Sequence, residues 1–268
     1  MTLVAVVGDA TTTTSVALAA SWSSGNEVTV LEADPDGGSL AAWLDTPSHP
    51  SLATIVANVG ADPGRDHRSS CSTFAAMTQQ SSAGVRFVAN AVRSRAAQRA
   101  VDEAATVVFP ALAEAEATVL VDVGAQRAGT GLSPVLGVAD IVVLVHRQAT
   151  ASAAAATVRV ERLVESVEEL ALLDADVVLA VIGNTPFEPG EIAAFVDDSV
   201  PDAVRTMAAL ADDPLTAATI AGRAGVSAKR LRRLPLMRDA GDLASVLSAL
   251  VETRRGKPVR LGPVGRRS

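Results

Sequence analysis

The residues with the clearest chemical potential form one polar stretch, Gly8-Asp9-Ala10-Thr11-Thr12-Thr13-Thr14-Ser15. It follows a short β-branched run and precedes an alanine-rich segment, so the order predicts a strand, a loop and a helix. The first amides of a helix have no partner inside the helix and point toward the loop, where they can bind an anion. This stretch therefore predicts a phosphate-type site, although threonines there can also act simply as helix caps.

A charge that phosphate sites use is absent from this stretch. The nucleotide-binding pattern G-x-x-x-x-G-K-[ST] places a lysine on the β/γ-phosphates and a hydroxyl on Mg²⁺. Here threonines stand in place of the glycine–lysine pair, and the only lysines of the chain are Lys229 and Lys257. Losing such an electrostatic donor costs on the order of a thousandfold in rate. We therefore expect reduced nucleotide affinity and slow or absent hydrolysis.

The rest of the chain alternates between strand and helix patterns. Apolar strand patterns occupy residues 3–7, 27–31, 85–89, 118–122, 141–145 and 177–182, and an edge strand is expected at 203–206. Helical patterns occupy 12–23, 39–44, 51–59, 94–113, 151–170 and 189–196, with two further helical stretches to about 251 and a loop at 61–70. The alternation predicts a single doubly wound α/β domain with a mostly parallel sheet flanked by helices.

Polar residues follow several of these strands. Glu32 and Asp34 come after the second strand, Asp122 ends a wholly apolar strand, His146-Arg147 follow the next one, and residues 184–187 follow another. Ligands of parallel sheets bind at the carboxyl ends of the strands, so these residues should share one rim with residues 8–14. Glu32 and Asp34 read alone are equally well explained as ordinary turn acids. No second histidine or cysteine lies at metal spacing from His146, which argues against a transition-metal site.

Composition limits the other possibilities. The chain has 268 residues, 49% of them hydrophobic and only 3% aromatic, so its core must consist of Ala, Val and Leu. A single cysteine excludes an internal disulfide framework and favours a cytoplasmic protein, and no apolar run is long enough for a membrane span. Six basic residues and no acid follow Glu252, which leaves 17 basic against 30 acidic residues in 1–252. We therefore expect an acidic domain at 1–252 and a flexible basic tail at 253–268.

Four further motifs support a resemblance to a known family. They are Leu31-Glu32-Ala33-Asp34-Pro35, Val119-Leu120-Val121-Asp122, Val181-Ile182-Gly183-Asn184 and Asp212-Asp213-Pro214. Together with Thr14-Ser15-Val16-Ala17-Leu18 they resemble the MinD/ParA-type P-loop ATPases, from Leu3 to about Val251. In that family a K-G-G-x-G-K-[ST]-T loop precedes the first helix. Laid on it, Gly8 takes the place of the signature lysine and Thr13 that of the phosphate lysine, so the motif is degenerate.

The resemblance implies roles for individual residues. ATP or ADP with Mg²⁺ would be bound by the loop residues Gly8, Asp9, Ala10, Thr11, Thr12, Thr13, Thr14 and Ser15, while Asn184, Asp213 and Pro214 would face adenine. Thr14, Asp34 and Asp122 would order Mg²⁺, and Glu32 and Asp34 would be the catalytic carboxylates, Glu32 placing the attacking water. The resemblance further implies a homodimer formed through the nucleotide face. It would work in positioning or assembly at division sites, in partition or in pilus and secretion machinery, and partners would recruit it to membrane or nucleoid.

Two other functions remain open at this point. Residues 215–234 read as a helix-turn-helix with a glycine turn, a serine cap and basic residues, which together with the basic tail would suit a DNA-associated regulator. The tail alone would suit non-specific contact with DNA or acidic lipid, since its glycines and prolines disfavour a helix. Alternatively, the altered rim serves a nucleotide-free scaffold as a protein interface.

Overall fold

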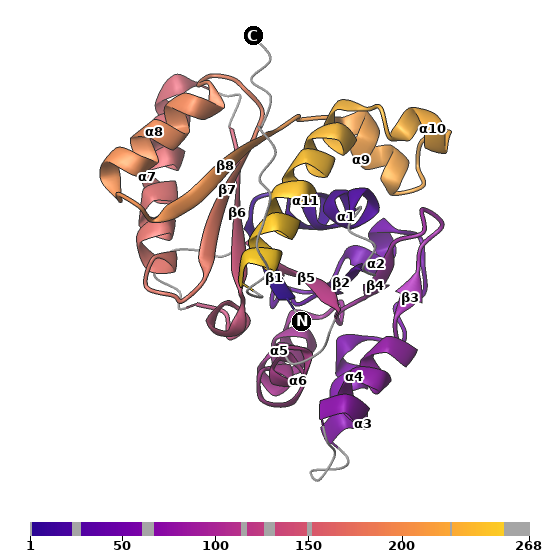
Figure 1. The fold of residues 1–268 in the computed structure, drawn as a ribbon. Coiled ribbons are helices and arrows are strands. Elements are labelled where there is room, and N and C mark those ends of the chain that lie inside the picture. Colours follow the sequence, from indigo (N-terminus) through magenta and orange to yellow (C-terminus); the bar gives the residue numbers. More distant parts are fainter. Residues whose placement is uncertain are drawn as a thin grey trace.

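A computed structural model describes residues 2–22, 28–60, 67–113, 117–125, 132–148, 152–225 and 227–254. Its centre is an eight-stranded sheet with the order β3-β4-β2-β5-β1-β6-β7-β8 (Figure 1). All neighbouring pairs are parallel except β3 with β4. The strands are β1 Thr2–Gly8, β2 Val28–Glu32, β3 Gln79–Gln80, β4 Arg86–Val88, β5 Thr118–Gly124, β6 Ile141–Arg147, β7 Asp176–Ile182 and β8 Val204–Leu210. The predicted doubly wound, mostly parallel sheet is confirmed.

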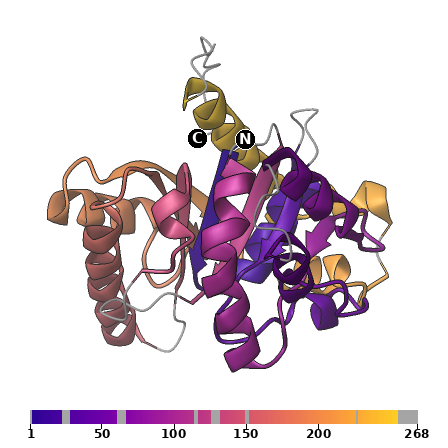
Figure 2. The same ribbon diagram turned by 90° about the horizontal axis from the view of Figure 1, so that it is seen from below.

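Helices cover both faces of this sheet. They are α1 Thr11–Ser21, α2 Leu40–Trp43, α3 Leu52–Gly60, α4 His67–Ala76, α5 Ser94–Val107, α6 Phe109–Ala113, α7 Ala153–Leu170, α8 Pro189–Ser199, α9 Pro214–Ile220, α10 Ala228–Leu231 and α11 Pro235–Arg254, with a 3₁₀ turn at Leu136–Val138. Figure 1 shows α1 beside α11, with α9 and α10 near them. In Figure 2, α7 lies to the left and α5 crosses the centre.

The two faces carry separate cores because successive side chains of a strand point in opposite directions. In β1, Leu3, Ala5 and Val7 pack under α3–α8, whereas Val4 and Val6 pack under α1, α2, α9 and α11. Central strands are therefore mostly apolar on both faces, as β5 is over residues 119–121 and β7 over residues 177–182. This double burial is why the strand patterns were readable in the sequence.

Two predictions of secondary structure differ from the structure: a loop at 61–70 and a single helix at 94–113. The last four residues of the expected loop at 61–70 are the start of α4. This helix packs through Phe74 on the core, and its Cys71 Sγ donates a hydrogen bond to the carbonyl oxygen of Ala111. Residues 61–66 lie outside the described residues. The expected helix at 94–113 is broken at Val108 into α5 and α6, consistent with Pro110, which cannot donate a backbone hydrogen bond to the preceding turn.

The C-terminal helix passes the expected domain boundary. α11 extends to Arg254, whose guanidinium donates to Asp176 Oδ2 at 2.8 Å and to the Asp174 carbonyl oxygen. This anchors the end of the helix at the amino end of β7. Residues 255–268, which include most of the predicted basic tail, lie outside the described residues.

Candidate functional site

The connection between β1 and α1 is too short for the nucleotide-binding pattern. In that pattern the stretch from the first glycine to the lysine, with five residues between them, connects a strand to the helix that follows. Here the helix already begins at Thr11, so only Asp9 and Ala10 separate Gly8 from α1. Ala10 takes the left-handed conformation at φ 51°, and a Cβ added to Gly8 would lie 2.3 Å from the carbonyl oxygen of Val145. The backbone therefore turns tightly against β6 and forms no wide loop around an anion.

The helix start also sets the register of the threonines. Thr12 Oγ1 donates to Asp122 Oδ2 at 2.6 Å, joining the first turn of α1 to β5. Thr14 Oγ1 instead donates to the carbonyl oxygen of Ala10 at 3.0 Å, within the helix. The position beside Asp122, at which the family pattern has its Mg²⁺ hydroxyl, is thus occupied by Thr12. The predicted register, which placed Thr14 there and Thr13 at the lysine position, disagrees with this geometry.

Asp122 is fully buried at the end of β5. Burial raises the pKa of its carboxyl, although the hydroxyls of Thr11 and Thr12 and the amide of Gly124 donate to it and act in the opposite direction. Asp34 lies close by: its Oδ1 accepts from the amide of Asp36 at 2.8 Å, and its side chain fills the space that a Cβ on Gly124 would occupy. The structure therefore brings Asp34, Asp122 and Thr12 into one neighbourhood.

Glu32, the predicted water-positioning group, is bound on both oxygens by the backbone. Its Oε1 accepts from the amides of Ser39 at 2.6 Å and Leu40 at 2.7 Å, and its Oε2 accepts from Asn90 at 2.9 Å. Glu32 is 1% exposed, and burial raises the pKa of its carboxyl despite these three donors. This geometry gives Glu32 a structural task, holding the start of α2 against the residues after β4. Its catalytic role stays a prediction.

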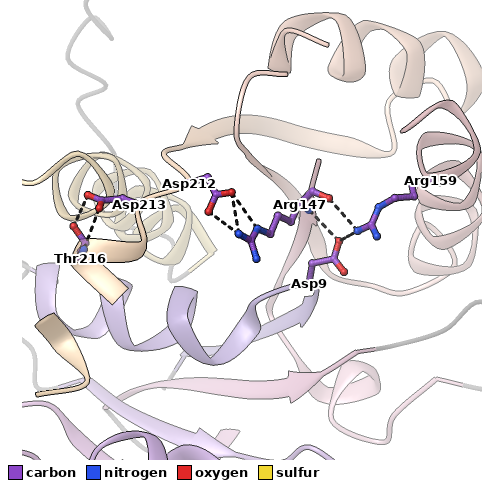
Figure 3. Close-up of polar contacts among 6 residues, drawn as sticks. All are labelled: Asp9, Arg147, Arg159, Asp212, Asp213 and Thr216. Atoms are coloured by element: carbon purple, nitrogen blue, oxygen red, sulfur yellow. Dashed lines mark hydrogen bonds and ion pairs between the residues drawn. The ribbon is translucent and has the colours of Figure 1, made fainter. Parts of the chain in front are cut away.

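Two ion pairs cross the rim between β1, β6 and the turn after β8 (Figure 3). Arg147 Nη2 lies 2.9 Å from each carboxylate oxygen of Asp212. Arg159 of α7 pairs with Asp9 and donates to the carbonyl oxygen of Arg147 at 3.0 Å, while the Arg147 amide donates to Asp9 Oδ2 at 3.0 Å. These contacts fix the backbone of Arg147 but leave its guanidinium bound only to Asp212 among the described residues.

A cavity of about 410 Å³ opens beside this guanidinium. It lies between α1, the ends of β6 and β7, the turn after β8, and α9. Its lining consists of Ala10, Thr13, Thr14, Arg147, Ile182, Ala211, Asp212, Asp213, Pro214, Ala217, Ala218, Arg223 and Leu236. We call it the α1–α9 cavity. It contains five of the predicted binding residues, and its volume falls in the range of small-ligand sites.

Other predicted residues lie elsewhere. Asn184 is exposed after Gly183 and is not among the residues that line the α1–α9 cavity. Ser15 is fully buried in the second turn of α1. Gly8 and Asp9 line a second cavity of about 510 Å³ with His146, Arg159 and Arg162, on the α7 side of β6. The predicted site is therefore divided among three neighbourhoods along one rim.

Asp213 and Pro214 begin α9. The Asp213 carboxylate caps the helix by accepting from Thr216, at 3.0 Å from the amide and 2.5 Å from the hydroxyl (Figure 3). Partial burial raises the pKa of Asp213, but the donors from Thr216, Leu236 and Leu215 outweigh it and hold the pKa below its usual value. Since Pro214 suits the first helical position, this motif has a sufficient structural explanation besides the predicted contact with adenine.

The helix-turn-helix prediction for residues 215–234 is not supported by the local structure. α9 ends at Ile220, and α10, Ala228–Leu231, has only four residues. Within the described part of 215–234, no helix of the length of a recognition helix therefore follows the glycine turn. The next helix, α11, begins at Pro235, beyond the predicted motif. Residue 226 lies outside the described residues.

The sequence placed Arg147 on the rim but gave no role there to Arg159 or Arg223. Arg147 and Arg223 line the α1–α9 cavity, and Arg159 pairs with Asp9 from 150 residues away. The position of Arg147 directly after a strand was a usable signal, but its partner Asp212 is 65 residues distant. Within the described residues, no three His, Cys, Asp or Glu side chains are arranged to hold a metal ion. Nor does any helix among them have the length and apolar character to cross a membrane.

No protein-family model and no curated protein sequence matches the chain. Several solved structures share its fold. A ParA family ATPase from Chlorobium tepidum TLS has a TM-score of 0.63 and 14% identity over 91% of this chain and 98% of that one. The septum site-determining protein MinD from Pyrococcus horikoshii OT3, complexed with Mg-ADP, has a TM-score of 0.63 and 16% identity over 94% and 98%.

A third similar structure is the cobyrinic acid a,c-diamide synthase of Mycobacterium smegmatis with a bound ATP analog and magnesium, with a TM-score of 0.54 and 14% identity over 97% and 100% of the two chains. The chain therefore has the fold of the MinD/ParA-type P-loop proteins. Because this fold also carries a synthase, the fold does not decide the function, which has to be argued from the site.

Proposed function

We propose that this protein is a MinD/ParA-like pseudo-ATPase, which binds a nucleotide at the strand-end rim, hydrolyses it very slowly or not at all, and acts in positioning or assembly. The observation that carries the proposal is the contrast between two parts of the rim. The α1–α9 cavity remains open and contains two arginines beside two aspartates, whereas the groups expected to perform hydrolysis are missing or engaged in holding the fold.

The α1–α9 cavity suits a phosphate-bearing ligand. Arg147 and Arg223 supply positive charge, and Thr13 and Thr14 belong to the first turns of α1, where the helix dipole also favours an anion. The apolar part of the lining, Ile182, Pro214 and Leu236, offers a surface for a flat base or another apolar group. ATP or ADP combines these two features.

Bound Mg²⁺ would neutralise phosphate charge and organise water around the phosphates. Thr12 and Asp122 are the residues of this chain that would hold it, since a hydroxyl and a carboxylate at these places are what the nucleotide-binding pattern uses. Neither residue lines the α1–α9 cavity. This separation favours weak dependence of binding on Mg²⁺.

Hydrolysis requires stabilisation of charge on the transferred phosphoryl group and a positioned water. The lysine is absent from the short loop, and the carboxylate of Glu32 is engaged by three backbone amides. Turning Glu32 toward a water would leave these buried amides without an acceptor, a cost of about 1–3 kcal/mol for each group. We therefore infer that nucleotide binding acts as a structural signal, read by a second copy of the chain or by a partner that docks on the rim.

Calorimetry with ATP, ADP and adenosine, each with and without Mg²⁺, tests the proposal together with a phosphate-release assay. We expect ATP and ADP to bind and to raise the melting temperature, since a ligand at about 100 times its Kd stabilises the native state by about 2.7 kcal/mol. Phosphate release should stay at background. Rapid turnover would contradict the pseudo-ATPase part, and neither heat nor a thermal shift would favour the nucleotide-free scaffold.

A cavity-filling pair locates the binding. Ala218→Phe places a ring in the α1–α9 cavity, whereas Ala194→Phe makes the same change on the exposed face of α8, outside that cavity. Ala218→Phe should abolish nucleotide binding and Ala194→Phe should leave it unchanged. Equal effects of the two variants would place the nucleotide elsewhere.

A further inference from the structure

We propose that Arg147, at the end of β6, binds phosphate at this rim in place of the absent loop lysine. In the ligand-free protein its guanidinium is paired with Asp212, and a polyphosphate displaces this carboxylate when it binds. The inference rests on the proposed function and deepens it. The ligand of the α1–α9 cavity is a polyphosphate, free or as part of a nucleotide. The carboxylate of Asp212 competes with this ligand for the guanidinium of Arg147.

The geometry places Arg147 where such a phosphate-binding group is needed. β6 is the immediate neighbour of β1, with Gly8 in register with Val145, so the end of β6 lies beside the start of α1. The Arg147 side chain lines the α1–α9 cavity together with Thr13 and Thr14. A guanidinium presents several N–H donors in one plane and can therefore grip a phosphate through two hydrogen bonds.

The backbone and the side chain of Arg147 are held by different partners. Asp9 accepts from its amide at 3.0 Å, and Arg159 donates to its carbonyl oxygen at 3.0 Å. The guanidinium alone contacts Asp212, as Figure 3 shows. The side chain can therefore exchange one anion for another while the strand end stays in place.

The ion pair between Asp212 and Arg147 is weak. The side chains of Arg147 and Asp212 are 49% and 39% exposed, and ion pairs at such exposure contribute little to stability. A polyphosphate carries more negative charge than a carboxylate and would also meet Arg223 and the start of α1 in the same cavity. Asp213 lines this cavity too, but its carboxylate is engaged by Thr216 at the start of α9. The ligand therefore competes favourably with Asp212, and the carboxylate lowers its apparent affinity.

This competition predicts opposite effects from the two halves of one ion pair. Arg147→Gln should weaken binding of MgATP and of tripolyphosphate by about tenfold or more. Asp212→Asn should strengthen both by about two- to fivefold. A purely structural ion pair would instead make both variants bind more weakly or equally well. Arg205→Gln removes the same charge from an exposed position of β8 that lines neither of the two rim cavities described above. It serves as the matched control and should bind like the wild type.

Titration calorimetry of the full chain and these variants with both probes, in the same Mg²⁺ buffer, decides the matter, with urea unfolding to verify that each variant folds. Tripolyphosphate binding with the opposite effects but no added affinity for ATP would support phosphate binding by Arg147 and contradict the nucleotide in the proposed function. ATP binding unchanged in Arg147→Gln, or weakened by both substitutions, would overturn this role of Arg147 while the proposed function stands. If neither probe binds the wild type, this role of Arg147 is overturned as well.

Discussion

Thr12 and Asp122 are 110 residues apart in the sequence, and their side chains meet at 2.6 Å between the first turn of α1 and the end of β5. This contact connects the tight β1–α1 turn to the buried carboxylate. Because α1 begins early, at Thr11, the hydroxyl beside Asp122 belongs to Thr12. Several properties of the molecule depend on this arrangement.

Thr12→Val should lower the free energy of unfolding by about 1–3 kcal/mol, because Asp122 stays buried and loses a donor. Thr13→Val is the matched control: it makes the same change on the next residue of the helix, which lines the cavity, and should stay within about 0.5 kcal/mol of the wild type. Urea unfolding without nucleotide measures both. If Thr13→Val loses more free energy of unfolding than Thr12→Val, the hydrogen bond between Thr12 and Asp122 does not account for the stability of this helix start.

Glu32→Gln should destabilise the fold by about 1.5–3 kcal/mol, since an amide cannot accept on both sides and one N–H would face a backbone donor. The exposed Asp36→Asn offers a comparison with the same loss of charge in the same turn. The phosphate-release rate should be equal in Glu32→Gln and the wild type. If the substitution leaves stability unchanged but abolishes a measurable turnover, Glu32 is catalytic after all.

Returning a lysine to the threonine run should not by itself produce an ATPase. Thr13→Lys adds a charge to the second position after the helix start, but the two-residue connection leaves no loop to surround a phosphate. We expect phosphate release to remain at background. A second variant carries three inserted residues between Ala10 and Thr11 together with Thr11→Lys, so that five residues separate Gly8 from the lysine. This variant should bind ATP about tenfold more tightly than the wild type, with urea unfolding to check the fold. Turnover by Thr13→Lys alone would contradict the structural register.

His146 should make the fold sensitive to mild acid. Burial lowers the pKa of its imidazole, while Asp9 raises it and Arg159 lowers it, so the folded state holds the proton less firmly than the unfolded chain. The stability due to neutral His146 is therefore present above about pH 6.5 and is lost as the pH falls below that value.

The matching measurement is urea unfolding of the wild type and His146→Gln at about pH 7.5 and pH 5.5. The wild type should lose more stability than the variant between the two, by about 1.4 kcal/mol for each unit by which folding lowers the pKa. The raised pKa values of Glu32, Asp34 and Asp122 act in the opposite direction in both proteins and cancel in the difference. Parallel pH profiles would contradict the prediction.

The sequence by itself determined the architecture. Continuous apolar runs such as residues 119–121 in β5 and 177–182 in β7 are typical of strands that are covered on both faces. Their alternation with helices favours a parallel, doubly wound sheet. It also determined which residues follow the strands, and hence which residues lie on the rim. α4 was missed because its residues show no clear apolar periodicity, and its place depends on Phe74 reaching a core built by distant segments.

Only the tertiary structure decided what the rim residues contact. Whether Glu32 faces a ligand or three amides depends on where residues 39, 40 and 90 arrive, and the choice between Thr12 and Thr14 depends on the turn at which α1 begins. The pairing of Arg147 with Asp212 joins two strand ends that local sequence patterns treat separately. Local patterns follow from backbone periodicity, whereas side-chain partners are determined by packing between segments far apart in the chain.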